Sequence, residues 1–516
     1  MADWTPEGLW ACLGRLGRPQ RWAFAGAWAA GLLAHGYMFV NKLPNHDDTA
    51  CFWNKGGSTG WGRWALDLMA RLDGGFSSPW MLGLLSLLFL SAAAMLLVGL
   101  LELQSPSLSA LAGAVFTVFP TVTSAFSYMF TCDAYMLSVL LAILSARLAA
   151  RGGWARLGAA GCLILSLGLY QGFLGWAVAL MIYTLLLRCL AEGASFRPIF
   201  LDGLWDLGVL AGGVAGYIGL TRVIWAVTDS GPVDYQGIDQ MGRVNLPALP
   251  GQMWDAWRLF YNVFRSPSLG ACTTPGLRFL LTACQWLAVG LIGARAVRQF
   301  RAGRRLEAAL AALLGLALPV GIGIVYLMNS ENVHTLMIYP MCMIPLVFLS
   351  QCDAWRRWAP PGRTPGAKRL QALGRAACAC LAALLAGRYA LLANEAYLCL
   401  QINHSRRLSY WNTVVTRIES VPGYTGQCPV VLIRENGWDR STPGVWNDPE
   451  PFNDLVGIRM PIHTHSDTDF LRLYLGFAPE FRDPAEYRDR AEVQEMPLYP
   501  HDGSVRLVDG AVVVKF

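Results

Sequence analysis

Apolar runs of about 20 residues recur along most of the chain and alternate with short polar connections. An α-helix needs about 20 residues to cross a hydrocarbon core about 30 Å thick. The pattern therefore predicts a mainly α, polytopic transmembrane helical bundle with about 11 spans. The expected spans are centred on residues 20–41, 79–101, 107–126, 133–150, 155–170, 172–190, 204–226, 275–294, 307–328, 333–352 and 373–393. The first span lacks a small-residue cleavage site, so we do not expect a cleaved signal peptide.

Basic residues gather in alternate connections between these spans, which predicts their orientation. Because cytoplasmic loops are enriched in Lys and Arg, these connections are expected to be cytoplasmic, with the N-terminus inside and the C-terminus outside. The connection at residues 102–106 has neither residue type and is neutral evidence. The clusters are Arg15/Arg18/Arg21, Arg147/Arg151/Arg156, Arg188/Arg197, Arg295/Arg298/Arg301/Arg304/Arg305 and Arg356/Arg357/Arg363/Lys368/Arg369.

Composition agrees with a membrane protein and gives no sign of a nucleic-acid partner. Of 516 residues, 54% are hydrophobic and 15% are charged, against about 25% charged in soluble domains. The net charge of +6 lies largely in short clusters without interleaved aromatic residues, unlike a nucleic-acid surface. The predicted partner of the apolar helices is the lipid bilayer.

Two long connections on the predicted outer side have helical periodicity. In residues 61–72, Arg63, Asp67 and Arg71 recur at i, i+4 and i+8, where they can pair, opposite an apolar face. Residues 251–265 repeat the pattern, with the aromatic side chains on one face. Both segments are predicted to be amphipathic helices in the membrane interface, forming either an outer-leaflet groove or plain aromatic anchors.

The composition changes from residue 394, where aromatic and charged residues mix and Pro and Gly recur. A helix is predicted over residues 405–420, and strands over 429–433 and 511–514. We therefore divide the chain into a transmembrane module, residues 1–393, and a small C-terminal extracytoplasmic α/β domain, residues 394–516.

Paired carboxylates are the first candidates for chemistry. The motif Asn45-His46-Asp47-Asp48 directly follows the first span, where an acid near membrane depth is costly and tends to be functional. The alternative is a solvated turn. Asp133 opens the fourth span, where a helix N-terminus also favours an acid, and Glu331 lies in a tight outer loop.

Other outer-side residues could support such acids. His46 and His334 could orient a carboxylate or contact a phosphate, or could be structural. Tyr170 and Gln171, at a helix hairpin, could meet a sugar or simply form the turn. Arg63 is one of several outer cations able to pair with a phosphate, alongside Lys42, Lys55, Arg222, Arg243, Arg258 and Arg265.

Cysteines and one acidic motif have ordinary alternatives. The 13 cysteines form no CxxC pattern, which argues against zinc or iron–sulfur sites. A disulfide among Cys51, Cys132, Cys272, Cys399 and Cys428 is possible outside, with Cys51–Cys132 as a candidate pair and free thiols as the alternative. The Asp467-Thr468-Asp469 motif resembles a metal site, but we favour a helix cap at Ser466 or Asp467.

Missing motifs narrow the class of protein. The chain has no GxxxxGK[ST] loop, so an ATP-driven pump is not predicted. Acids are scarce in the middles of the predicted spans, which weakens an ion-coupled transporter.

The order of several motifs resembles the Gtr type II family of serotype-converting O-antigen glucosyltransferases, membrane enzymes of the GT-C class. The similarity covers nearly the whole chain, although no single motif is specific. It rests on Asn45-His46-Asp47-Asp48, Gly62-Arg63-Trp64, Cys132-Asp133-Ala134-Tyr135, Leu167-Gly168-Leu169-Tyr170-Gln171 and Met496-Pro497-Leu498-Tyr499-Pro500 with the following Val512-Val513-Val514-Lys515.

The resemblance implies a GT-C-like fold and a polyprenyl-phosphate sugar donor, usually undecaprenyl phosphate glucose. The acceptor would be a lipid-linked glycan, typically O-antigen, on the periplasmic face of a bacterial inner membrane. A first-loop acid would be the general base of an inverting transfer, and we favour Asp48 with Asp47 in support. No cofactor is certain, and a divalent cation, Mg or Mn, stays an option. The alternatives are a polysaccharide or lipid-sugar transporter and an O-antigen polymerase.

Overall fold

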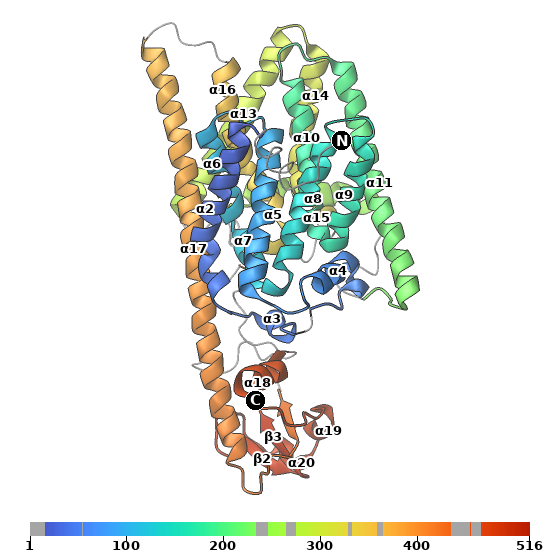
Figure 1. Ribbon diagram of the computed structural model, residues 1–516, viewed down its shortest axis with the longest axis vertical. Helices are drawn as coiled ribbons and strands as arrows, with labels where there is room; N and C mark the ends of the chain where they lie inside the picture. Colours follow the sequence, from blue (N-terminus) through green and yellow to red (C-terminus); the bar gives the residue numbers. More distant parts are fainter. Residues whose placement is uncertain are drawn as a thin grey trace, which may run out of the picture.

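The computed structural model describes residues 16–53, 55–233, 246–264, 275–328, 333–358, 365–434, 455 and 466–516. Long helices stand side by side as a bundle, and a small sheet with short helices lies beyond one end of it (Figure 1). This end, near which α3 and α4 lie, corresponds to the predicted outer side.

The bundle consists of single helices and one bent pair. The pair is α6 (Pro106–Val118) and α7 (Pro120–Ser127), bent by 42° at Phe119. The single helices are α2 (Arg18–Val40), α5 (Pro79–Leu100), α8 (Cys132–Ala149), α9 (Ala155–Leu169), α10 (Leu174–Cys189), α11 (Phe196–Thr228), α13 (Pro275–Arg301), α14 (Arg305–Ile322), α16 (Met343–Trp358) and α17 (Pro365–Glu419). Proline begins α5, α6, α7, α13 and α17, where its missing N–H costs no hydrogen bond.

The helices agree in place with the predicted spans, but the count of 11 stays a prediction. Among the described residues, eight helices are long and apolar enough to cross a membrane, or nine with the bent pair. The predicted span at 155–170 coincides with α9, which has only 15 residues, and the span at 333–352 with the 16-residue α16 and the short turns before it.

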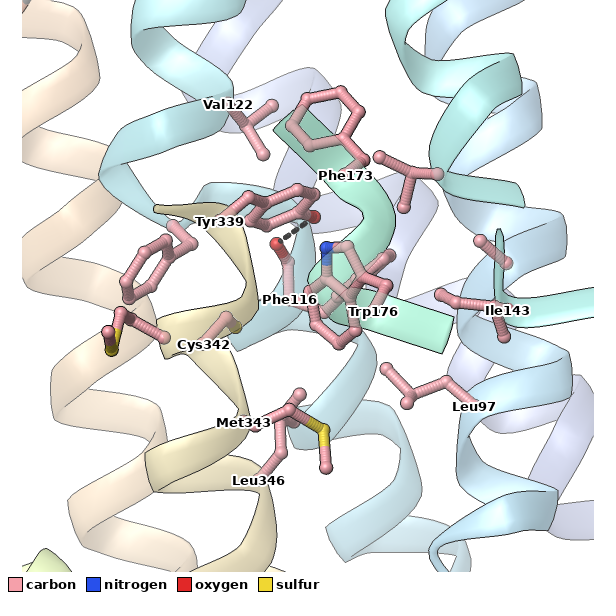
Figure 2. Packing of buried hydrophobic residues seen from close by; sticks show 14 of the residues in the cluster. Leu97, Phe116, Val122, Ile143, Phe173, Trp176, Tyr339, Cys342, Met343 and Leu346 are labelled. Atoms are coloured by element: carbon pink, nitrogen blue, oxygen red, sulfur yellow. Dashed lines mark hydrogen bonds between the residues drawn. The ribbon is translucent and has the colours of Figure 1, made fainter. Parts of the chain in front are cut away.

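Aromatic rings from distant helices meet in the centre of the bundle (Figure 2). Phe116 of α6 lies 5.2 Å from the rings of both Trp176 (α10) and Tyr339, which begins η8 (Tyr339–Cys342). The Tyr339 hydroxyl donates to the Phe116 carbonyl at 2.8 Å, so its polar end is satisfied in the core. This cluster fixes α6, α10 and α16 against one another.

Two glycines let α2 and α6 approach at backbone distance. A Cβ on Gly26 would lie 2.1 Å from the Ala110 carbonyl oxygen, and one on Gly113 would lie 2.2 Å from that of Ala23. α17 covers the same helices, since Tyr397 hydrogen-bonds with His35 at 2.7 Å. The close packing orients α2, which leads directly into the outer-side motif.

We expect Gly113→Ala to destabilise the bundle by about 1–3 kcal/mol, because backbone atoms cannot move aside for the new methyl group. Thermal unfolding in detergent measures the effect. Gly36→Ala is the matched control, since no heavy atom lies within 4 Å of its added Cβ. Equal unfolding temperatures for the two variants would contradict this account of the α2–α6 contact.

Several short helical elements lie beside the long helices, mostly toward the outer end of the bundle. The predicted amphipathic helices at 61–72 and 251–265 correspond to α4 (Trp64–Leu72) and α12 (Leu249–Asn262). The remaining elements are α3 (His46–Ala50), η1 (Thr59–Trp61), η2 (Met129–Thr131), η3 (Gln171–Phe173), η5 (Leu246–Ala248), α15 (Val325–Met328) and η7 (Thr335–Met337).

The charged face of α4 is used differently from the prediction. The Asp67 carboxylate accepts the backbone N–H groups of Ser58 and Thr59, each at 2.9 Å, and the Thr59 hydroxyl. Asp67 therefore fastens the preceding loop to α4. Backbone N–H groups held close by the tight turn of η1 stabilise this carboxylate more than long, solvated arginine side chains would.

The C-terminal part packs a three-stranded sheet against the end of α17. The strands are β1 (Val430–Ile433), β2 (Val505–Val508) and β3 (Ala511–Lys515) in the order β1-β3-β2, with β1 parallel and β2 antiparallel to β3. The predicted strands correspond to β1 and β3, whereas β2, a short and largely exposed edge strand, was missed. The helices are α18 (Asp467–Leu475), α19 (Ala485–Arg488) and α20 (Ala491–Gln494).

Helix α17 joins the two parts without a break. Its 55 residues pack on α2 and α6 at one end, and Trp411, Val414 and Ile418 pack on the sheet at the other. The boundary drawn at residue 394 thus falls inside a continuous helix, and the predicted helix at 405–420 is its last part.

Candidate functional site

The outer-side acidic motif folds into a short capped helix. Asn45 is the N-cap of α3, and its side-chain oxygen accepts the backbone N–H of Asp48 at 2.8 Å. Thr49 adds a hydroxyl bond to the Asn45 carbonyl at 3.0 Å. Both acids lie in the first turn, where the helix dipole favours negative charge. This local chemistry explains why Asn-His-Asp-Asp forms a helix turn here.

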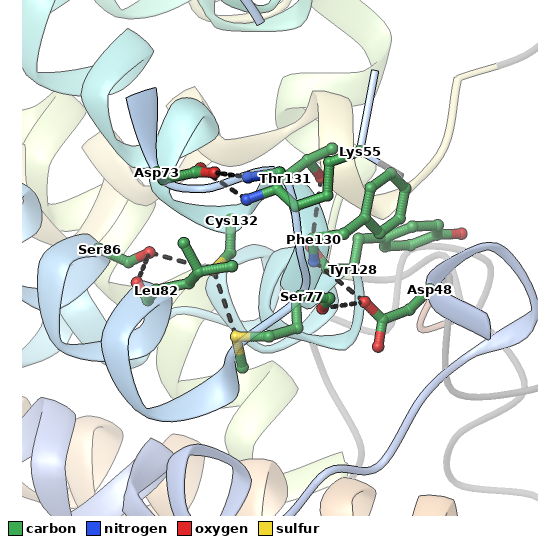
Figure 3. A network of polar contacts seen from close by, with 12 residues as sticks. Asp48, Lys55, Asp73, Ser77, Leu82, Ser86, Tyr128, Phe130, Thr131 and Cys132 are labelled. Carbon is green, nitrogen blue, oxygen red and sulfur yellow. Dashed lines mark hydrogen bonds and ion pairs between the residues drawn. The ribbon is translucent and has the colours of Figure 1, made fainter. Parts of the chain in front are cut away.

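Asp48 is completely buried, which excludes the solvated-turn interpretation for this residue (Figure 3). One carboxylate oxygen accepts the Ser77 hydroxyl at 2.5 Å and the Phe130 backbone N–H at 3.1 Å. The other pairs with the Lys42 ammonium, which also donates to Ser77 at 2.6 Å. Asp48 thereby joins the end of α2, the first outer loop and the turn before α8.

Asp47 has a different environment from its neighbour. It is half-buried on the same turn of α3. The backbone of His46 belongs to α3, but its side chain lies outside the described residues. Of the two adjacent acids, only Asp47 retains access to solvent.

Helix α18 of the C-terminal part lies against α3 (Figure 1). Burial, and then the charge of Asp48, raises the pKa of the Tyr474 phenol on α18. Burial, followed by the charges of Asp47, Asp48 and Asp469 of α18, raises the pKa of Cys51 to about 12. The acidic motif is therefore enclosed between the bundle and the C-terminal part.

Cys51 consequently stays a neutral thiol at physiological pH, without the thiolate that nucleophilic attack or metal binding requires. Cys51, Cys132 and Cys428 are free thiols, so the suggested Cys51–Cys132 pair is not formed. Cys132 instead accepts the Ser86 hydroxyl inside the bundle at 3.1 Å. Cys272 lies outside the described residues.

Asp133 is buried at the start of α8, close to a second ion pair of the first loop. Lys55 and Asp73 form this pair at 2.6 Å, and both side chains are almost fully enclosed. Asp133 is 1% exposed, and its neighbours are this lysine and this carboxyl group. Asp73 and Ser77 were missed by sequence reasoning, because only the fold brings them to α8.

Arg63, Tyr170 and Gln171 come together on the other side of α8. The Arg63 guanidinium lies 4.9 Å from the centre of the Tyr170 ring and donates to Gln171 at 3.4 Å. The Tyr170 ring in turn lies 4.4 Å from that of Tyr135, in the first turn of α8. Gln171 also donates to the Tyr217 hydroxyl at 2.8 Å. These residues and the Asp48 network flank the same helix end.

Two predicted site residues remain, His334 and Glu331. His334 is half-buried and precedes η7, which packs against α7 and η3, the turn that begins with Gln171. Glu331 lies outside the described residues.

The Asp-x-Asp motif has a structural role at its first acid. Asp467 is fully buried and pairs with Arg407 of α17 at 2.9 Å and with Arg434 at the end of β1. Ser466 is the N-cap of α18 as predicted, but its side chain makes no capping hydrogen bond. The ion pairs fasten α18, and thus the surface that covers α3, to the long helix.

The described residues bring no three His, Cys, Asp or Glu side chains together as a metal site. Both oxygens of Asp48 are already occupied by Lys42, Ser77 and Phe130. Among the described residues, the Asp48 carboxylate therefore has no free oxygen for the divalent cation that the resemblance leaves open.

Helices of membrane-spanning length are compatible with an integral membrane protein, and the carboxylate site at one end of the bundle is its candidate catalytic centre. A family model described as glucosyl transferase GtrII matches residues 36–349. This match covers more than half of the chain, which therefore belongs to that family of glucosyltransferases. All nine predicted site residues lie within the matched range, whereas α17 and the C-terminal part lie beyond it. No curated protein and no solved structure matches the chain.

Because Asp48 is buried and Asp47 is partly exposed, we expect their replacement by alanine to lower stability by different amounts. Asp48→Ala leaves Lys42 without its buried partner and should cost about 3–5 kcal/mol of stability. Asp47→Ala, at a partly exposed position, should cost no more than about 1 kcal/mol. Unfolding of the purified variants in detergent measures both values, and an equal loss of stability would contradict the anchoring role of Asp48.

Proposed function

We propose that the chain transfers glucose from a polyprenyl-phosphate donor to a lipid-linked O-antigen glycan at the outer face of the bacterial inner membrane. Membership of a glucosyltransferase family supports the glucosyl transfer. The observation that carries the site is the pair of unlike acids on α3, one buried as an anchor and one accessible. The N-terminus is then cytoplasmic, and the C-terminal part is periplasmic.

The proton of the acceptor hydroxyl goes to a carboxylate of α3. Sequence reasoning favours Asp48 as this base, but its carboxylate is enclosed and stabilised as an anion by Lys42. An enclosed carboxylate whose two oxygens already have partners cannot reach the acceptor hydroxyl. The geometry therefore supports Asp47 as the base and Asp48 as the residue that positions it.

The acceptor oxygen, as it loses its proton, attacks the anomeric carbon of glucose. The bond between this carbon and the phosphate oxygen breaks, polyprenyl phosphate leaves with the electron pair, and the anomeric configuration inverts. Arg63, held between Tyr170 and Gln171 at the outer end, is the best-placed described cation of this cluster to stabilise the leaving phosphate. The partly exposed Gln171 would then orient the sugar, and the buried Tyr170 would hold Arg63 in place.

An apolar place for the donor's lipid chain lies within the bundle. A cavity of about 340 Å³ opens between α12, α13, α14 and α16. Its walls are almost entirely apolar, and Phe260 and Tyr261 of α12 line it. Aromatic rings continue from Tyr261 through Trp257, at 4.4 Å, to Trp254 along α12. This arrangement supports a donor whose chain enters from the bilayer.

The decisive test is transfer in vitro by the purified chain. Synthetic polyprenyl phosphates carrying glucose, galactose or mannose are offered with a lipid-linked O-antigen acceptor, and the product is analysed by mass spectrometry and NMR. We expect an inverted glucosyl linkage with the glucose donor. Lipid-sugar movement without a new glycosidic bond would favour a transporter, and use of a diphosphate-linked glycan donor would favour a polymerase.

The base assignment predicts that Asp47→Asn lowers kcat by about 10²–10⁴-fold while leaving the unfolding temperature nearly unchanged. Glu192→Gln, an exposed acid at the opposite end of the bundle, is the matched control and should retain full activity. An active, stable Asp47→Asn variant would remove Asp47 from the mechanism, irrespective of the donor used.

A further inference from the structure

Three charged side chains are buried together where the first outer loop meets α8. Asp133 is 1% exposed, and the side chains of Asp73 and Lys55 are 8% and 3% exposed. Lys55 and Asp73 pair at 2.6 Å, and both lie beside the turn that enters α8 (Figure 3). The cluster is separate from the Asp48 network, although both hold the same turn.

The carboxylate oxygens of Asp133 lack side-chain hydrogen-bond donors among the described residues. Of the donors in this part of the chain, only the nearby Ala134 backbone N–H favours the anion. The carboxyl group beside it is that of Asp73. Two ionised carboxylates cannot hydrogen-bond to each other, but they can once one of them carries a proton.

The charges in this cluster do not balance. Two carboxylates face one ammonium group, which leaves one negative charge without a partner in an enclosed site. The start of α8 favours an anion through the helix dipole, but this effect is weaker than the cost of burying an unpaired carboxylate. A proton on one carboxyl group removes the surplus negative charge and supplies the missing hydrogen-bond donor.

We propose that Asp133 carries a proton at neutral pH and donates it in a hydrogen bond to Asp73, and that this carboxyl pair with Lys55 is a positioning device for the acids of α3. This inference rests on the proposed function for its effect on transfer. This proton forms the O–H donor from Asp133 to Asp73, while Lys55 neutralises the remaining charge.

The loop backbone connects this pair to the α3 site. The Lys55 N–H donates to the Gly75 carbonyl at 3.1 Å, and the Ser77 N–H donates to the Phe52 carbonyl at 2.9 Å. Ser77 is the residue whose hydroxyl reaches Asp48. These two backbone hydrogen bonds of the loop thus connect the carboxyl pair to the Asp48 network.

The sign of the pH dependence follows from the proton on Asp133. The native protein would bind one more proton here than the unfolded chain does at neutral pH, so stability falls as pH rises. The other titratable groups around Asp133 are Lys55 and Asp73 in the loop and the Cys132 thiol on its own helix. Loss of the proton leaves two carboxylates facing one lysine, which separates the loop from α8.

Asp133→Asn and Asp133→Ala in the full chain distinguish a neutral from an anionic Asp133. An asparagine amide can donate to Asp73 as a protonated carboxyl would, whereas alanine cannot. We expect Asn to keep transfer within about threefold of the native chain and Ala to lose about tenfold or more. Asn should also flatten the decline of the unfolding temperature that the native chain shows as pH rises from about 4 to 7.

Asp353→Asn is the matched control for the pH dependence. Asp353 is also buried, but its carboxylate accepts two backbone N–H groups, from Gln104 at 2.6 Å and Ser105 at 3.3 Å. Its replacement should leave the decline between about pH 4 and 7 in place. A loss of the decline in this variant would overturn the assignment of that decline to Asp133.

Two outcomes decide the proposal independently of the donor. If folded Asp133→Asn is as inactive as Asp133→Ala and keeps the decline between about pH 4 and 7, Asp133 works as an anion and the proposal is wrong. If the native chain transfers no glucose, the proposed function fails, but the unfolding profiles still test the proton. Infrared spectroscopy provides a further check, because the native chain should show a protonated-carboxyl band that Asp133→Asn lacks.

Discussion

The buried carboxylate of Asp48 is the constraint on which the outer end of the bundle depends. It lies where three separate stretches of chain meet, and it satisfies Lys42, Ser77 and the Phe130 N–H at once. A buried ion pair of this kind adds little net stability by itself, because desolvation opposes the Coulomb attraction. Its main effect is on the arrangement of the loop, because one carboxylate bonds to all three partners at once.

The C-terminal part completes the enclosure that Asp48 begins. The buried pairs of Asp467 with Arg407 and Arg434 fix α18 to α17 and to β1, and α18 in turn lies on α3. The acidic motif is thus held from the bundle side and covered from the other. Asp47, on the turn between these two contacts, keeps partial access.

Elements with a local signal could be predicted from the sequence, and contacts between distant segments could not. Long apolar runs located the helices, and β-branched runs located β1 and β3, because both patterns reflect burial along one element. The strand β2 lacks such a run and was missed. The motif of Asp47 and Asp48 was found, but their different environments depend on Ser77 and Phe130, 29 and 82 residues away from Asp48 in the sequence.

The other candidates divide in the same way. Arg63, Tyr170 and Gln171 were selected separately, and the fold brings them together because α4 packs against α9. The pairing of Arg63, Asp67 and Arg71 was inferred from helix spacing alone, and it failed to foresee that the preceding turn presents its own N–H groups to Asp67. Asp73 has no local pattern that marks it as the neighbour of Asp133.

The unbroken course of α17 has a mechanical consequence. At 1.5 Å per residue, its 55 residues extend about 80 Å, well over twice the thickness of a hydrocarbon core. A rod of this length acts as a lever, so a small change in its tilt within the bilayer becomes a larger sideways displacement at its far end. Bilayer thickness and lateral pressure are therefore coupled to how firmly α18 rests on α3.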